Sequence, residues 1–422
     1  MKFSSFQLDD RLQRAVVAAG YTKATPVQEA AIPPALEGRD LIGTAQTGTG
    51  KTAVFVLPIL QSLLTTPARR GRVRALIVTP TRELAEQIHA AIQELGRFTK
   101  IRSATVYGGV GFEPQTRALR NGTEIIVACP GRLLDHVGRG NADLRGVEIL
   151  ILDEADRMLD MGFLPDVRRI VNQTPRERQT MLFSATFAPE LGHLAADILR
   201  DPQRIAIGVA APADTVEHTL CPVDQREKTA LLLRLLKETD TASVLIFTRT
   251  KHRADRLAAQ IKRSGHRAAV LHSNRTQGQR QQALDGFRAG KYDLLVATDI
   301  AARGLDVTTI SHVINYDMPS TVDDYIHRIG RTGRAERSGD ALTLVTADDH
   351  ATVRDIERVL GGSVTVRKVE GFDYGMPTMA TGGPNGGRAA RTPTSYRSRP
   401  KGPSYGGRKR TQGYAATRSA AR

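Results

Sequence analysis

Cysteine is scarce in this chain of 422 residues. Its two cysteines, Cys129 and Cys221, form no C-x-x-C pair, which argues against both a disulfide framework and a structural zinc site. Long apolar runs are also missing, because the longest, around 53–64 and 75–78, are too short to span a bilayer. The N-terminal segment becomes acidic before an apolar signal segment could form. We therefore expect a cytoplasmic protein without a membrane partner.

Acidic residues are absent from the end of the chain. Residues 380–422 contain ten Lys or Arg and no Asp or Glu. The formal net charge is +16, and the ten charges of this segment leave only +6 for residues 1–379. A basic excess of this size indicates an anionic partner, bound by a basic arm on a mildly basic body. Aliphatic residues nearly vanish after about residue 370, so we predict that residues 371–422 form a disordered tail.

Short β-branched runs alternate with longer amphipathic segments over most of the chain. This alternation predicts an α/β protein whose parallel sheets are covered by helices on both faces. The pattern runs twice, so we predict two domains, 1–208 and 215–370, joined by a small-residue linker at 209–214. The predicted strands are Ala75–Val78, Glu124–Ala128, Val147–Leu152, Thr180–Phe183, Val244–Thr248, Ala268–Leu271, Asp293–Ala297, His312–Asn315 and Ala341–Val345. The predicted helices include Glu83–Leu95, Lys228–Lys237 and Arg253–Ser264.

A cluster of acids follows the mainly apolar run 147–152. It reads Asp153-Glu154-Ala155-Asp156, so two carboxylates follow directly on a predicted buried strand. Asp153 is placed to hold Mg²⁺, and Glu154 to orient and deprotonate an attacking water. Taken alone, such a cluster also fits the start of a solvated helix.

A glycine-rich segment, 45–52, lies upstream of the acids in the same predicted domain. Gly48 and Gly50 let backbone N–H groups turn toward phosphate oxygens at the start of a helix. Lys51 would reach the β- and γ-phosphates, and the Thr52 hydroxyl would bind Mg²⁺. The segment departs from the usual G-x-x-x-x-G-K-[ST] pattern at Ala45. The predicted nucleotide loop is Ala45, Gln46, Thr47, Gly48, Thr49, Gly50, Lys51 and Thr52. The loop 45–52 and the acid pair Asp153 and Glu154 together suit the cleavage of a β–γ phosphate bond by water.

A basic cluster, 327–334, lies in the second predicted domain. Arg331 and Arg334 are three residues apart, so on a helical turn they project from one face. Two guanidinium groups there could meet the γ-phosphate as arginine fingers, which completes the site only when the domains close. The alternative is a basic helix that faces solvent or nucleic acid.

These segments resemble the motifs of the DEAD-box RNA helicases of superfamily 2, from Phe6 to about residue 368. The resemblance implies two tandem RecA-like domains, and the short core with a basic tail looks most like the bacterial RhlE-type subgroup. Residues 20–28, with Phe6 upstream, resemble the Q motif. By this resemblance Gln28 reads the adenine edge of ATP while Phe6 stacks on its ring. Asp306, in a segment that resembles motif V, would hold the ribose.

The resemblance also implies a groove for an RNA backbone. Residues 80–85 resemble motif Ia, 108–109 the GG motif, 129–132 motif Ib, 246–250 motif IV and 277–280 the Q-x-x-R motif. The residues that it implies to meet RNA are Arg82, Gly108, Gly109, Pro130, Gly131, Arg132, Arg280, Thr298 and Arg303. Motif Ib departs from the family at Cys129, where Thr is usual, and a thiol is the poorer donor. The segment 271–275 also differs from the commonest sequence in the family, and its residues suggest no mechanism.

Further segments resemble motifs that link nucleotide state to domain closure. Residues 184–186 resemble motif III, and 327–334 resemble motif VI. The residues expected to couple the domains are Asp156, Ser184, Thr186, His327 and Arg328.

Residues and resemblance together predict an ATP-dependent, Mg²⁺-requiring RNA helicase that remodels short duplexes and releases RNA on hydrolysis. We expect a monomer that binds RNA backbones, possible targets being ribonucleoprotein or ribosomal precursors. One alternative is a DNA-directed superfamily 2 translocase, because no residue can be shown to meet a 2′-OH. Another is a non-catalytic RNA clamp or annealing protein that binds through its tail. Lys51, Glu154, Arg331 and Arg334 are all present, which favours catalysis.

Overall fold

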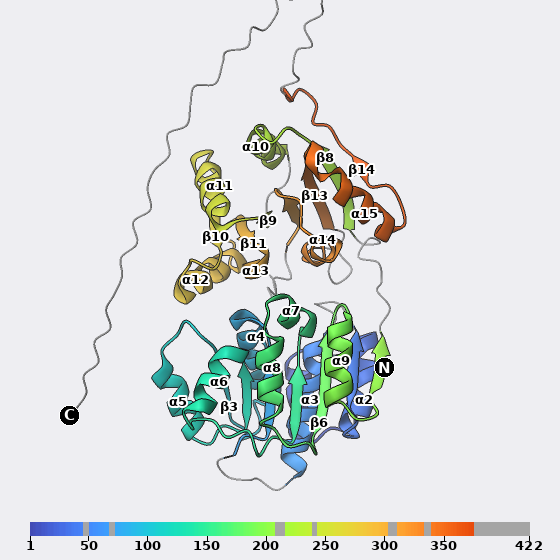
Figure 1. Cartoon of the computed structure of the whole chain (residues 1–422), viewed down its shortest axis with the longest axis vertical. Helices are drawn as coiled ribbons and strands as arrows, with labels where there is room; N and C mark the ends of the chain where they lie inside the picture. Colours follow the sequence, from blue (N-terminus) through green and yellow to red (C-terminus); the bar gives the residue numbers. More distant parts are fainter. Residues whose placement is uncertain are drawn as a thin grey trace, which may run out of the picture. The chain divides into compact units, whose positions relative to one another are not determined.

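The computed structural model describes residues 1–44, 50–66, 72–206, 216–238, 243–302, 310–332 and 339–374 (Figure 1). Within these ranges the chain forms two seven-stranded sheets, one in residues 41–206 and the other in 216–366. The strand pairs of both sheets are parallel. The predicted α/β class with two tandem RecA-like units is confirmed. The predicted linker at 209–214 and the tail beyond residue 374 lie outside the described residues.

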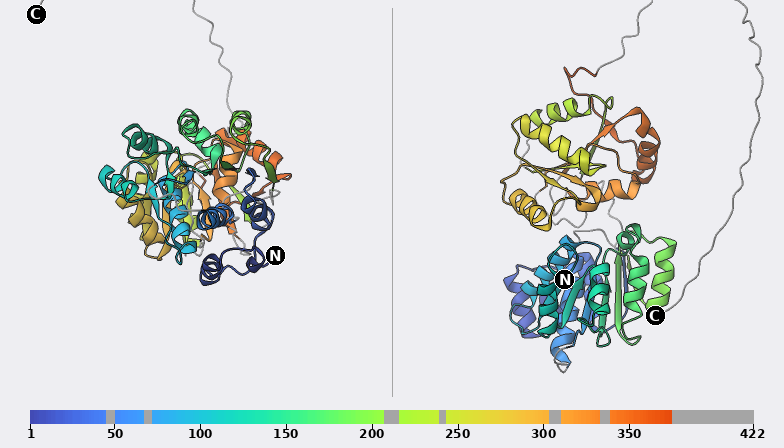
Figure 2. Two further views of the ribbon diagram at one scale, coloured as in Figure 1. Left: turned by 90° about the horizontal axis from the view of Figure 1, so that it is seen from below. Right: turned by 60° about the vertical axis from the view of Figure 1, so that its left-hand side comes forward.

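The first sheet has the strand order β3-β4-β2-β5-β6-β1-β7. Its strands are β1 Leu41–Thr44, β2 Ala75–Val78, β3 Ser103–Val106, β4 Ile125–Ala128, β5 Ile149–Leu152, β6 Gln179–Ser184 and β7 Gln203–Ala206. The helices are α1 Asp10–Ala18, α2 Pro26–Leu36, α3 Lys51–Thr65, α4 Arg82–Leu95, α5 Phe112–Arg120, α6 Pro130–Gly138, α7 Ala155–Asp160, α8 Leu164–Val171 and α9 Pro189–Ile198, after the short 3₁₀ helix Phe3–Ser5. Helices α1 to α4 form the core on one face, and α5 to α9 on the other (Figure 2).

Strand β5 shows why these segments become central strands. Ile149 and Ile151 pack toward α1 to α4, whereas Leu150 and Leu152 pack toward α5 to α9. Because successive side chains point to opposite faces and both faces are covered, each position must be apolar.

The second sheet has the order β10-β11-β9-β12-β13-β8-β14. Its strands are β8 Val216–Pro222, β9 Val244–Thr248, β10 Ala268–Leu271, β11 Leu294–Thr298, β12 His312–Asn315, β13 Gly339–Val345 and β14 Thr365–Val366. The helices are α10 Lys228–Glu238, α11 Lys251–Arg263, α12 Gln277–Arg288, α13 Asp299–Ala302, α14 Val322–Ile329 and α15 His350–Leu360, with a 3₁₀ turn at Ala347–Asp349. Helices α10 and α11 cover one part of the sheet, α12 another, and α14 with α15 a third.

Buried ionic side chains tie together the amino-terminal ends of the strands in the first sheet. The Arg74 guanidinium, fully buried, donates to both carboxylate oxygens of Glu148 at 3.0 and 2.9 Å. The Asp40 carboxylate accepts from the backbone N–H groups of Thr180 and Arg200, both at 2.7 Å. This end of the sheet is therefore structural, and the opposite, carboxyl-terminal end is where a parallel sheet binds ligands.

Candidate nucleotide and RNA site at the carboxyl edges of the sheets

The first sheet gathers the predicted site residues at the carboxyl ends of its strands. The glycine-rich segment follows β1, the acid cluster follows β5, and residues 184–186 follow from the end of β6. These three strands are neighbours in the order β5-β6-β1. The motif Ia, GG and motif Ib segments follow β2, β3 and β4, which are neighbours in the order β3-β4-β2. The predicted nucleotide-binding segments and the predicted RNA-binding segments therefore lie side by side at the carboxyl-terminal end of one sheet.

Helix α3 begins with Lys51, directly after a glycine that no other residue could replace without strain. Gly50 has φ +87°, and a Cβ added to it would lie 2.5 Å from Nε2 of Gln28. Lys51 is buried, and its charge acts on Asp153 and Glu154. Thr52 follows in the first turn of the helix. The rest of the predicted loop, Ala45 to Thr49, lies outside the described residues.

Gln28 links the start of α2 to the end of this loop. Its Oε1 accepts from the N–H of Thr25 at 2.8 Å, and its Nε2 donates to the carbonyl of Gly50 at 3.1 Å. Phe6 is buried and packs edge-on against Phe3, with ring centroids 5.4 Å apart. Adenine recognition by Gln28 and stacking by Phe6 stay predictions. Gln28 lies in the first turn of α2, and Phe6 is buried in the core to which α2 contributes.

Asp153 is a buried carboxylate at the end of β5. Its side chain accepts from the N–H of Glu154 at 3.0 Å. Burial raises the pKa of Asp153 to about 6, although the charge of Lys51 opposes this rise. A buried carboxylate of this kind is stabilised by a nearby cation, which suits the predicted Mg²⁺ position.

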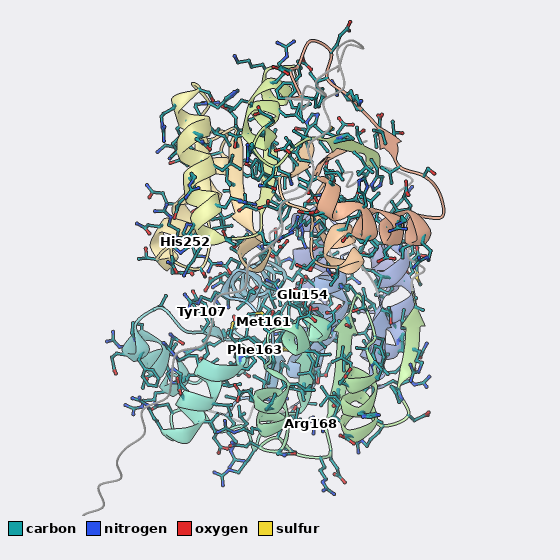
Figure 3. All side chains as sticks on the ribbon, turned by 45° about the horizontal axis from the view of Figure 1, so that its top comes forward. Tyr107, Glu154, Met161, Phe163, Arg168 and His252 are labelled. Atoms are coloured by element: carbon teal, nitrogen blue, oxygen red, sulfur yellow. The ribbon has the colours of Figure 1, made fainter. Side chains whose placement is uncertain are left out.

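Glu154, labelled in Figure 3, precedes the first residue of α7 in a left-handed backbone conformation with φ +51°. Few residues other than glycine adopt this conformation, and such strain concentrates at functional sites. Its Oε2 accepts from Nη1 of Arg157 at 3.0 Å. Burial acts to raise the pKa of Glu154, but Arg157, Arg331 and Lys51 together outweigh it and hold the pKa below its ordinary value. Glu154 is therefore ionised at neutral pH, as a general base must be.

Arg157 is a site residue that the sequence analysis missed. It is buried in the first helical turn after Glu154, three residues along. The i, i+3 spacing of an acid and an Arg at a helix start was the available signal.

Asp156 joins the acid cluster to the segment that resembles motif III. Its Oδ2 accepts from the N–H groups of Ala185 and Thr186, both at 2.9 Å, and from the Thr186 hydroxyl at 3.3 Å. The N–H of Asp156 donates to the Ser184 hydroxyl oxygen at 3.2 Å. Any shift of α7 is therefore transmitted to residues 184–186, which supports the predicted coupling role.

Arg82, Gly108, Gly109 and Arg132 come together in the other half of the edge. Gly109 has φ +83°, and a Cβ added there would lie 2.0 Å from Nη1 of Arg82. A Cβ on Gly108 would be 3.8 Å from Nη2 of Arg82 and 4.0 Å from Nη2 of Arg132. Arg132 donates to the carbonyl of Val110 at 3.2 Å. Two guanidinium groups beside a glycine backbone, where no side chain blocks access, suit the binding of a nucleic-acid phosphate backbone.

Gln115, which the sequence analysis did not select, holds this glycine turn. Its Nε2 donates to the carbonyls of Tyr107 and Gly111, both at 3.1 Å, and its Oε1 accepts from the N–H of Tyr107 at 3.1 Å. Tyr107, labelled in Figure 3, also donates its hydroxyl to Glu86 on α4 at 2.5 Å. The turn is therefore fixed from α4 and α5.

Replacing Gly109 with alanine is expected to raise the RNA concentration for half-maximal ATPase stimulation about tenfold, because Arg82 must leave its position and lose a charge-assisted phosphate contact. Titration of ATP turnover with single-stranded RNA measures this. The matched control is Gly140→Ala, where φ is +68° and no atom lies within 4 Å of the added Cβ. Equal effects of the two substitutions would mean that backbone strain alone is responsible.

Cys129 precedes α6 in an extended conformation and makes no side-chain cap, while Pro130 and Gly131 form the first turn. Burial raises the pKa of Cys129 to about 12, so the group is a neutral thiol. Cys129→Thr is expected to stabilise the protein by about 1 kcal/mol, because a threonine hydroxyl caps free N–H groups of the first turn. Thermal unfolding of this variant beside Cys129→Ala measures the gain. A Tm equal to that of the alanine variant would contradict the capping argument.

Arg328 organises the carboxyl end of the second sheet. Its guanidinium pairs with both oxygens of Asp299 at 2.5 and 2.7 Å, and Nη1 also donates to the Asn315 side chain and the Asp317 carbonyl. Thr298, the last residue of β11, precedes Asp299 directly. Asp299, Asn315 and Asp317 all belong to the half of the chain that forms the second sheet, so the predicted interdomain role of Arg328 stays a prediction.

Arg331 follows α14, one turn after His327. It is buried, and its Nε donates to the carbonyl of His327 at 3.3 Å. Its charge helps to lower the pKa of Glu154. Of the other predicted residues here, Arg303, Asp306 and Arg334 lie outside the described residues.

The first turns of α4 and α12 are in direct contact. Nη1 of Arg82 donates to Oε1 of Gln277 at 3.5 Å, and Arg280 pairs with Oε1 of Glu83 at 2.8 Å. Both members of the Arg280–Glu83 pair are largely buried. The predicted RNA contact of Arg280 stays a prediction, and the structure gives it a carboxylate partner.

Neither a membrane helix nor a ready-made metal cluster occurs in the described ranges. No helix there has the length and apolar content to cross a bilayer. Nor do those residues hold three or more His, Cys, Asp or Glu grouped so as to bind a metal ion.

In comparisons with known proteins, both halves of the chain match helicase families. Residues 25–194 match the family described as DEAD/DEAH box helicase, and residues 227–336 match the helicase conserved C-terminal domain. The chain is 42% identical to the ATP-dependent RNA helicase CshA of Limosilactobacillus reuteri over 85% of this chain and 72% of the relative. It is 41% identical to the ATP-dependent RNA helicase SrmB of Escherichia coli K12, over 87% of this chain and 84% of SrmB.

A solved structure extends the likeness to three dimensions. Dbp5 of S. cerevisiae, bound to RNA and ADP BeF3, superposes with a TM-score of 0.79 at 31% identity, over 87% of this chain and 95% of that one. Since sequence, motif order and fold agree, this chain belongs to the DEAD-box RNA helicase family.

Proposed function

We propose that this chain is an ATP-dependent RNA helicase in which ATP and single-stranded RNA bind to adjacent halves of one sheet edge. The observation that carries the proposal is the strand order β3-β4-β2-β5-β6-β1, because it sets the phosphate-suited turns beside the acid pair. The relatives named ATP-dependent RNA helicases and the RNA-bound Dbp5 support it.

Hydrolysis is assigned to the residues around β5. Glu154, ionised and held by Arg157, takes a proton from the attacking water. Lys51 holds the terminal phosphates, and Arg331 offsets the negative charge that develops on them. Asp156 passes the change at the γ-phosphate to residues 184–186 through the hydrogen bonds of its carboxylate.

Asp153 and Thr52 fit a Mg²⁺ ion. The buried Asp153 carboxylate has its pKa raised by burial, and Mg²⁺ is usually held by one or two carboxylates together with phosphate oxygens and water. When bound, the ion would neutralise part of the charge on the phosphates. Gln28, in the first turn of α2, and Phe6, buried in the core to which α2 contributes, would select adenine.

The remaining parts of the proposal concern the setting of the activity. We assign the chain to the RhlE-type subgroup on its short core and basic tail, and to the cytoplasm as a monomer that acts on ribonucleoprotein or ribosomal precursors. The tail, ten Lys or Arg without an acid in residues 380–422, would add salt-dependent affinity for any RNA.

The test is duplex unwinding with matched RNA and DNA substrates of one sequence. The proposal expects ATP-dependent strand separation of RNA and much slower separation of DNA. Equal rates would favour a DNA-directed translocase, and ATP-independent annealing without turnover would favour a clamp protein.

A further inference from the structure

The segment 271–275 contains a buried histidine held from two sides. His272 is 1% exposed and lies directly after β10. Its Nδ1 faces the backbone N–H of Asn274 at 3.3 Å, and its Nε2 faces Oδ1 of Asp255 at 3.0 Å. A backbone N–H can only donate, so Nδ1 accepts and Nε2 carries the proton that Asp255 receives. A neutral imidazole therefore satisfies both contacts at once.

Helix α11, which carries the His252 labelled in Figure 3, supplies the partners of this segment. Asp255 also pairs with Arg275. Nζ of Lys251 donates to the Asn274 side chain at 3.0 Å. The first two turns of α11 thus hold both the buried and the exposed side of the segment 272–275.

The held segment leads directly into α12. Thr276 caps this helix, with its hydroxyl accepting from Gln279 and the Gln279 side chain accepting from the Thr276 N–H. Gln277 and Arg280 in the first turn contact Arg82 and Glu83 of α4. A shift of residues 272–275 would therefore move the turn that faces the predicted RNA half of the site.

We propose that His272 is a positioning residue for the RNA-dependent step, acting through Asp255 to fix the direction in which α12 presents Gln277 and Arg280. The inference rests on the proposed function, because RNA-stimulated turnover is what the positioned turn controls. His272 itself touches neither RNA nor nucleotide in this assignment. His272 affects the RNA concentration needed for half-maximal stimulation of ATP turnover, and it leaves the chemical step at Glu154 intact.

The test measures ATP turnover of the full chain while single-stranded oligouridylate is titrated. His272→Ala is expected to raise the half-maximal RNA concentration about tenfold, with turnover unchanged at saturating RNA and without RNA. Asp255→Ala, at a half-exposed helix position, is expected to match it, and the double variant to add no further effect. His272→Gln keeps a donor toward Asp255 and is expected to recover part of the loss.

The matched control is His312→Ala. His312 also pairs with an aspartate, Asp340, at 3.0 Å, but at the start of β12 and β13, the opposite end of the sheet. The proposal is overturned if His272→Ala and His312→Ala behave alike, or if His272→Ala also lowers turnover at saturating RNA. It is overturned as well if the effects of His272→Ala and Asp255→Ala add up in the double variant. Should His272→Ala not fold, Asp255→Ala and His272→Gln decide by the same readout. A wild-type chain without RNA stimulation would instead overturn the proposed function.

Discussion

Glu154→Gln is expected to lower ATP turnover by roughly 10²- to 10⁴-fold, because an amide cannot accept the proton of the attacking water. The carboxylate that is lost is buried, ionised and held by Arg157 at 3.0 Å, with Lys51 and Arg331 contributing further positive charge. Glutamine has nearly the same size and keeps an oxygen for Arg157. Nucleotide binding and the fold should therefore persist while phosphate release slows by this factor.

The measurement is phosphate release at saturating ATP and RNA, with binding of a fluorescent nucleotide and thermal unfolding followed in parallel. Glu177→Gln, an exposed acid in the same unit, removes the same charge away from the site and should leave all three quantities unchanged. Normal turnover by Glu154→Gln would remove Glu154 from the role of general base.

Arg331→Ala is expected to reduce RNA-stimulated turnover by at least about 10³-fold, the lower end of what an arginine finger contributes. The Arg331 side chain is buried, and its charge already acts on Glu154 in the first unit. Its loss should leave RNA-free turnover much less affected, because the finger acts when the γ-phosphate site is completed. Arg331→Lys keeps the charge but loses the planar fork of donors, so it should restore only part of the rate.

Arg354→Ala is the matched control for this substitution. Arg354 on α15 donates its Nε to the carbonyl of His350 at 3.4 Å, as Arg331 does to His327 at 3.3 Å, but it is solvent-exposed and outside the proposed site. A loss of turnover shared by Arg331→Ala and Arg354→Ala would point to a general effect on the second unit. A proportional fall with and without RNA would argue that Arg331 serves the basal reaction rather than its RNA dependence.

Most internal strands and the edge strand β10 could be predicted from the sequence, whereas β1, β3, β7, β8 and β14 could not. Strands such as β2, β5 and β11 are apolar at successive positions because helices cover both of their faces. The edge strand β7 and the strand β8 carry polar residues, and β14 has only two residues. Strand β1 includes Gly43, which is required because a Cβ there would lie 2.5 Å from the Phe183 ring. That constraint comes from a residue far along the chain.

For the site, the sequence predicted which residues face the ligands but not what holds them. The glycine-lysine loop and the acid pair could be predicted because their proposed chemistry demands those residue types after a strand. Gln115, Arg157 and His272 act on other protein groups, and their spacing to those groups is set by the folded chain. Arg328 differs from these residues. The sequence analysis expected it to act between the domains, and the structure shows its buried guanidinium paired with Asp299 in its own domain.

The central claim is that RNA controls ATP hydrolysis at the Asp153–Glu154 pair. It is tested most directly by the rate of phosphate release from wild-type protein at saturating ATP, with and without single-stranded RNA. We predict that RNA raises this rate several-fold and that Glu154→Gln abolishes the increase. Equal rates in the presence and absence of RNA would contradict the account.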